Sequence, residues 1–285
     1  MENIEGPAEH PLREEHLAGC MRLSQAANWN QNEADWRVML AFGRGWGVTL
    51  GDGTLAASTL VLPYGGKFAW VSMVLVLPEH RRKGFATQLL KKALVENSRS
   101  RLTSILDATP AGHEVYLQEG FRDCWGFRRF SLSSSSKKFP LQKEVRPMKV
   151  SDWPQILRLD APAFGASREA LLCNLAARLP EAALAAERDG QITGFLLGRD
   201  GREARQLGPL VARDGQTANA LLGAALSRVA APLYVDITDR AASLQAWAQQ
   251  CGFEFQRSFT RMAHGAANAP GDASLVYCPA GAELG

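Results

Sequence analysis

Residues 74–87 constrain the fold more than any other part of the chain. An apolar run typical of a buried strand ends in a basic turn, and the residues that follow have the spacing of an amphipathic helix. The first N–H groups of a helix are unpaired and carry the positive end of its dipole, so such a turn can bind anions. Gly84 and Ala86 leave room for a pyrophosphate, and residues 81–83 add positive charge. The pattern predicts an α/β domain with a phosphate-binding turn.

This turn resembles the signature of the GNAT superfamily of N-acetyltransferases: Arg or Gln, two residues, Gly, one residue, then Gly or Ala. Residues 81–86 read RRKGFA, and the flanking VLPE at 76–79 and Leu89-Leu90 also fit that family. The alternative is a strand, turn and helix whose basic turn is only solvated. The resemblance implies an acetyl-CoA site formed by Val74, Leu75, Val76, Arg81, Arg82, Lys83, Gly84, Phe85, Ala86 and Thr87.

A tyrosine stands four residues before a Gly-Phe pair, in the sequence YLQEGF at 116–121. This segment is similar to the second recurring motif of the GNAT superfamily, in which the tyrosine faces the thioester sulfur. A phenol there can protonate or hydrogen-bond the departing thiolate, so Tyr116 is the candidate general acid. The alternative is an amphipathic tyrosine that packs its ring into the core.

The base that would deprotonate the amine is not identified by the sequence. Asp107 is one candidate, because some relatives carry a carboxylate on the strand before the tyrosine helix, but it serves equally well as a cap. Glu33 and Asp35 are further candidates.

The segment at 28–36, NWNQNEADW, lies where this superfamily folds its early helices over the acceptor site. Its aromatic and amide side chains predict an acceptor wall that includes Trp29, Asn30 and Glu33. A helix cap followed by core tryptophans is the alternative.

The length of 285 residues fits two domains, and SSSSKK at 133–138 predicts the linker between them. We expect domains at 1–138 and 139–285. In the first we expect helices before residue 45, strands near 46–49, 55–62 and 68–77, a helix at 84–97, a strand at 102–106, a helix at 111–119, and strands after Phe121. The fold class is α/β with a mixed sheet.

The two halves repeat each other. CMRL at 20–23 matches ILRL at 156–159, and LDAT at 106–109 matches VDIT at 235–238. A third match lies near the end of each half and keeps the same internal spacing. It pairs Gly120-Phe121, Phe127 and Arg129 with Gly252-Phe253, Phe259 and Arg261. These matches predict a duplicated fold.

The second half resembles a diverged copy. Residues 207–218 lack the RxxGxA pattern, and Ala248 stands where the tyrosine would be. The whole chain resembles a bacterial tandem GNAT subgroup with an active-looking first domain. We therefore expect the second domain to be noncatalytic and to shape the acceptor pocket or a homodimer interface.

Composition excludes several other classes. A net charge of +3 with scattered basic residues predicts no nucleic-acid partner, and five cysteines without paired spacing predict no metal site and a reducing cytoplasm. No signal peptide or long apolar run is evident, so we expect no membrane association. The expected activity is acetyl transfer from acetyl-CoA to a primary amine in a ternary complex. The alternative is a noncatalytic CoA-binding sensor.

Overall fold

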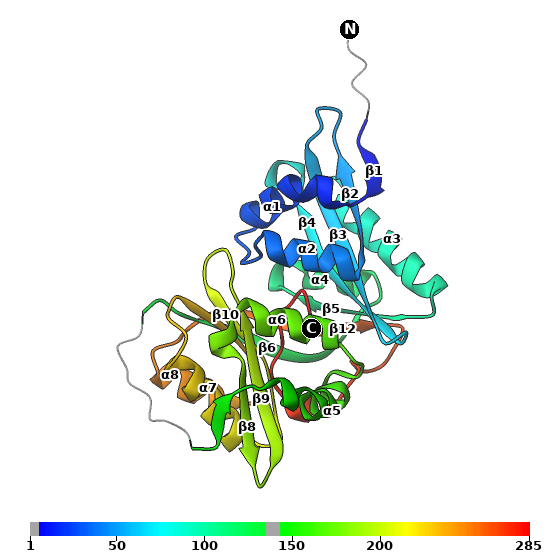
Figure 1. Ribbon diagram of the computed structural model, residues 1–285. Coiled ribbons are helices and arrows are strands. Elements are labelled where there is room, and N and C mark those ends of the chain that lie inside the picture. The colour runs from blue at the N-terminus through cyan, green and yellow to red at the C-terminus, as the bar shows by residue number, and fades with distance from the viewer. Residues whose placement is uncertain (1–5, 135–142) are drawn as a thin grey trace.

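The computed structural model describes residues 6–134 and 143–285, and the predicted boundary between 138 and 139 lies outside these ranges. In the described residues the strands form one mixed sheet, in the order β1-β2-β3-β4-β5-β12-β6-β11-β10-β9-β8-β7, with β13 beside β10. The sheet runs through both halves of the molecule, and helices pack on its faces (Figure 1). The predicted α/β class with a mixed sheet is confirmed.

The first half has the expected elements with one addition and one omission. Its elements are β1 Ala8–Pro11, α1 Leu17–Ala26, α2 Glu33–Phe42, β2 Arg44–Thr49, β3 Leu55–Tyr64, β4 Phe68–Val76, α3 Phe85–Arg99, β5 Thr103–Ala108, α4 Pro110–Gln118 and β6 Arg122–Leu132. The helices expected before residue 45 are present as α1 and α2, and the sequence did not predict β1, which pairs with β2. Of the several strands expected after Phe121, the described part of this half, which ends at residue 134, contains β6 alone.

The second half repeats this order of elements. It contains β7 Val145–Pro147, α5 Trp153–Phe164, α6 Glu169–Arg178, β8 Leu184–Arg188, β9 Gln191–Arg199, β10 Arg205–Ala212, α7 Gly215–Leu226, β11 Leu233–Thr238, α8 Ala242–Gln250, β12 Glu254–His264 and β13 Val276–Cys278. The matched sequence segments occupy equivalent elements, in α1 and α5 and in β5 and β11. The short β13 has no counterpart in the described part of the first half.

The halves exchange their last long strands. β12 of the second half lies between β5 and β6, and β6 of the first half lies between β12 and β11. Phe127 and Phe259 face each other where β6 and β12 cross, with stacked rings 4.9 Å apart. Each half therefore completes the sheet of the other.

Two buried ion pairs fix this exchange, and they occupy equivalent positions. Arg129 on β6 forms two hydrogen bonds with Asp236 on β11, both 2.7 Å. Arg261 on β12 forms the same contact with Asp107 on β5, at 2.8 and 2.9 Å. The residues that match between the halves in sequence thus bind across the exchange rather than within one half.

The halves also share a hydrophobic core. One cluster of buried side chains includes Leu23 of α1, Met39 of α2, Leu159 of α5 and Leu172 of α6. A second cluster packs α3 on the sheet of the first half, and a third packs α7 and α8 on that of the second. Apolar burial on this scale is the dominant favourable term in folding, so the two halves stabilise each other.

Candidate active site

The basic turn after β4 leads into an uncapped helix. A 3₁₀ turn at Pro78–His80 follows β4, and Gly84 then precedes α3 with a left-handed φ of 84°. No side chain caps the N-terminus of α3. A Cβ built on Gly84 would have no atom within 4 Å, so the space in front of the helix is open. Unpaired N–H groups with open space before them suit a bound phosphate.

The strand that leads to this turn has an open edge. β4 and β5 are parallel and pair only from Phe68 to Trp70, with Thr103 to Ile105 opposite. Beyond Trp70 the two strands are unpaired, which leaves backbone groups of residues 74–76 facing a cleft of about 600 Å³. An extended amide-containing ligand can hydrogen-bond to such an edge. The cleft is lined by Val74, Leu75, Val76, Arg81 and Ala86 on this side and by Pro110, Gly112, Val115 and Tyr116 on the other.

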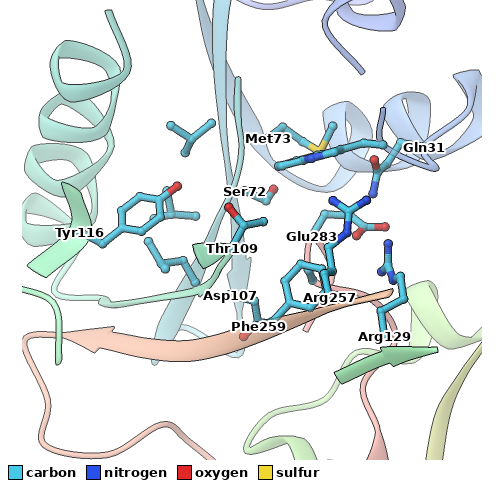
Figure 2. Close-up of a pocket in the computed structure, with 15 residues that line it drawn as sticks. Gln31, Ser72, Met73, Asp107, Thr109, Tyr116, Arg129, Arg257, Phe259 and Glu283 are labelled. Atoms are coloured by element: carbon cyan, nitrogen blue, oxygen red, sulfur yellow. The ribbon is translucent and has the colours of Figure 1, made fainter. Parts of the chain in front are cut away.

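Tyr116 projects into the cleft from α4. Side chains on a helix lean toward its N-terminus, so the Tyr116 ring lies over Gly112, where an added Cβ would come within 3.0 Å of the ring. The ring packs edge-on against Phe121, with centroids 5.8 Å apart. Burial raises the pKa of the phenol to about 12. Among the described residues its hydroxyl has no hydrogen-bond partner, and Figure 2 shows it pointing toward the centre of the pocket.

A second, smaller cavity adjoins the cleft at Tyr116. Both hollows share Trp29, Val74, Asp107, Thr109, Tyr116 and Arg257 as lining residues. The second half supplies much of the smaller cavity, through Arg257 and Phe259 on β12 and through Ala282 and Glu283 after β13. The strand exchange is what brings β12 to this position. The second half thus lines a cavity beside Tyr116, and its role in shaping an acceptor pocket or a homodimer interface stays a prediction.

Three buried oxygen atoms in the smaller cavity have no hydrogen-bond partner in the described residues. They are Gln31 Oε1, Ser72 Oγ and Glu283 Oε2, on side chains that are at most 5% exposed. The other carboxylate oxygen of Glu283 contacts Arg199. A buried acceptor without a partner costs free energy, so these atoms suit a ligand that brings N–H or O–H groups. Figure 2 shows Gln31 and Glu283 on the side opposite Tyr116, with Ser72 between.

The predicted acceptor residues separate into two groups. Trp29 lines both hollows. Asn30 does not, because its amide bonds to the backbone of Glu203 and Ala204 at 2.9 to 3.1 Å and so joins the two halves. Glu33 is exposed and pairs with Arg37 at 2.7 Å. The structure thus brings neither Asn30 nor Glu33 to the site.

The candidate bases are held in ion pairs. The side chain of Asp107 is fully buried and lines both hollows, and burial raises its pKa against the opposing effect of Arg261. Both of its carboxylate oxygens bind Arg261, whose guanidinium lies over the rings of Trp70 and Trp125. Asp35 accepts a hydrogen bond from the backbone N–H of Asn32, the N-cap of α2, and pairs with Arg178 and Arg199, each at 2.5 Å.

The corresponding site of the second half is filled by the chain itself. β10 and β11 also pair only at their starts, but beyond that point Val276 and Cys278 of β13 pair with Val211 and Leu210 of β10. The N-terminus of α7 is capped as well, because the side chain of Asp214 accepts a hydrogen bond of 2.7 Å from the backbone N–H of Thr217. This hydrogen bond keeps the pKa of Asp214 below its usual value. An open edge and an open helix terminus are therefore found in the first half but not here.

Sequence reasoning missed the residues that the second half contributes. Arg257 and Glu283 lie far from either motif, and nothing local marks them as site residues. The matches of Phe127 with Phe259 and of Arg129 with Arg261 indicated that β6 and β12 are related, but pairing between the halves does not follow from that likeness.

Comparison with known proteins agrees with this geometry. A GNAT acetyltransferase domain model matches residues 43–123, and a second GNAT acetyltransferase domain model matches residues 156–278. The chain belongs to the GNAT acetyltransferase family, as two domains in tandem. This assignment places the tandem GNAT protein among acyltransferases.

Individual relatives of this GNAT protein span nearly its whole length. The N-acetyltransferase YitH of Bacillus subtilis strain 168, itself uncharacterized, is 26% identical over 85% of the chain and 86% of its own length. A crystal structure from Pyrococcus horikoshii covers 100% of the chain and 99% of its own, with a TM-score of 0.79 and 21% identity. A tandem GNAT protein from the clavulanic acid biosynthesis pathway covers 92% and 100%, with a TM-score of 0.63 and 16% identity. At 21% and 16% identity, these two structures show similarity of fold alone.

No helix in the described ranges, 6–134 and 143–285, is long and apolar enough to cross a membrane. No group of three His, Cys, Asp or Glu side chains in these ranges is placed to hold a metal ion.

Proposed function

We propose that this GNAT protein transfers an acetyl group from acetyl-CoA to a primary amine, with the cofactor bound in the first half only. The uncapped N-terminus of α3 suits the pyrophosphate, and the open edge of β4 suits the amide groups of the pantetheine arm. Bound there, acetyl-CoA supplies an activated thioester.

The position of the Tyr116 hydroxyl is the main support for the proposal. This unpartnered hydroxyl stands where the cofactor cleft and the smaller cavity meet. A phenol with a pKa of about 12 stays protonated at neutral pH and can donate a hydrogen bond. A thiol has a pKa of roughly 8.5, so transferring the proton fully to the thiolate is uphill. Tyr116 therefore acts mainly as a hydrogen-bond donor to the developing negative charge.

Direct attack by the amine fits the residues that line the two hollows. None of the lining side chains is a cysteine, and the Ser72 hydroxyl has no hydrogen-bond partner in the described residues that could activate it as a nucleophile. The unpartnered oxygens of Gln31, Ser72 and Glu283 can accept N–H bonds from an amine. Cys20, Cys124, Cys173 and Cys278 form no disulfide, which supports a reducing cytoplasm as the location.

The test combines binding and turnover. Calorimetry should detect acetyl-CoA binding, and Gly84→Glu should abolish it because bulk and negative charge then occupy the space before α3. Gly190→Glu is the matched control, since Gly190 also has positive φ and open space but lies in the β8–β9 hairpin. Unchanged binding in Gly84→Glu would refute the cofactor site.

Turnover separates an enzyme from a CoA-binding sensor. A screen of amines should show acetyl-CoA-dependent release of CoA thiol that Tyr116→Phe reduces. Binding of acetyl-CoA without release from any amine would favour the sensor, which the full engagement of both Asp107 oxygens also favours.

A further inference from the structure

One arginine at the smaller cavity lacks an ion pair, whereas the arginines around it are paired. Arg129 is paired with Asp236, and Arg261 with Asp107. Arg199 is likewise paired, with Asp35 and Glu283. Arg257 lines the same cavity and has no carboxylate partner among the described residues.

The position of Arg257 makes its lack of an ion-pair partner costly. Arg257 on β12 lies directly opposite Arg129 on β6, and like charges at such a pair of positions repel. The guanidinium is half-buried, and burial together with the charge of Arg129 lowers its pKa. An anion bound at Arg257 would remove both penalties.

Arg257 belongs to the acceptor end of the site rather than to the phosphate turn. Arg81 lines the cofactor cleft only, whereas Arg257 also lines the smaller cavity with Gln31, Ser72 and Glu283. The cavity thus presents one unpaired cation and three unpartnered, buried acceptor oxygens. A ligand that matches this set has a carboxylate and several N–H bonds.

We propose that the acceptor is an amino acid or a related compound with both an amine and a carboxylate, and that Arg257 binds the carboxylate. This inference rests on the proposed acetyltransferase function. Arg257 then determines specificity, while the buried oxygens of Gln31, Ser72 and Glu283 receive N–H groups of the acceptor.

Matched pairs of amines test the inference. Each pair differs by the carboxylate alone: lysine and 1,5-diaminopentane, phenylalanine and 2-phenylethylamine, 4-aminobutyrate and propylamine. We expect at least one acid to be acetylated with a kcat/KM about 10- to 100-fold above that of its partner. In Arg257→Gln this ratio should fall to near one. Arg128→Gln is the control, because Arg128 is on β6 beside Arg129 but pairs with Asp239 outside both hollows.

The outcomes distinguish the inference from the function on which it rests. Equal use of both members, preference for the amine without a carboxylate, or an unchanged ratio in Arg257→Gln would overturn the inference and leave the acetyltransferase intact. Acetyl-CoA binding with no transfer to any of these acids would also overturn it. A wild-type protein that fails to bind acetyl-CoA by calorimetry would instead refute the proposed function.

Discussion

Substitution of a single side chain can distinguish a catalytic role from a structural one at this site. Tyr116→Phe removes one hydroxyl that has no partner in the described residues, so the fold and the acetyl-CoA affinity should be nearly unchanged. We expect kcat to fall by roughly 10² to 10³, the range for loss of one hydrogen-bond donor to a developing negative charge. Thermal unfolding, calorimetry and kinetics on one preparation check this. Wild-type kcat in a folded variant would rule the role out.

The paired carboxylates Asp107 and Asp236 allow a controlled comparison at the same scale. Removing the charge of either one leaves a buried arginine unpaired, so Asp107→Asn and Asp236→Asn should each cost about 3–5 kcal/mol in the free energy of unfolding. Denaturant titration measures both. If the two costs differed severalfold, the two ion pairs would not be equivalent.

The sequence predicted some residues of the site because their neighbours in the chain determine their role. The turn at 81–86 and Tyr116 each depend on a helix a few residues away, and Arg81, Ala86 and Tyr116 line the cleft, while their roles in binding and catalysis stay predictions. Asn30 and Glu33 were predicted for an acceptor wall, but contacts with distant residues determine the position of Asn30, and a local ion pair holds Glu33 at the surface. Arg257 and Glu283 reach the site through strand pairing, which has no local pattern.

At the scale of elements, the two halves differ at the point where two parallel strands separate, β4 from β5 in the first half and β10 from β11 in the second. In the first the edge of β4 is open, and in the second β13 pairs with β10 and Asp214 caps α7. The sequence predicted the loss of the phosphate turn, because the RxxGxA pattern is absent there. It did not predict that a strand some 65 residues further along would fill the space.

One acetyl-CoA should therefore bind per chain. Calorimetry on the full-length protein should give a stoichiometry of one, and Gly84→Glu should reduce it to zero. The full chain is needed because a fragment of residues 145–285 would lack β6, which pairs with both β11 and β12. A stoichiometry of two, or one remaining site in Gly84→Glu, would contradict a filled second cleft.

For the whole molecule, the strand exchange and the shared core predict cooperative unfolding. The fragments 1–138 and 139–285 should be unstable when expressed separately, because each lacks a central strand of its sheet. Co-expressed, they should associate into a complex that binds acetyl-CoA. Size-exclusion chromatography and circular dichroism measure this. Two separately folded, monomeric fragments would show that the exchange is dispensable.

The strand exchange also delays completion of the first half's sheet during synthesis on the ribosome. β5 has no neighbour on its open side until β12 is made, and β12 ends 132 residues after β6. At synthesis rates of 5–20 residues per second, this is a wait of roughly 7 to 26 s. During that interval the nascent first half presents an unpaired strand edge, the kind of surface at which chains aggregate. Slow translation of the second half would lengthen this exposure, so the yield of folded protein depends on how soon the last tenth of the chain emerges.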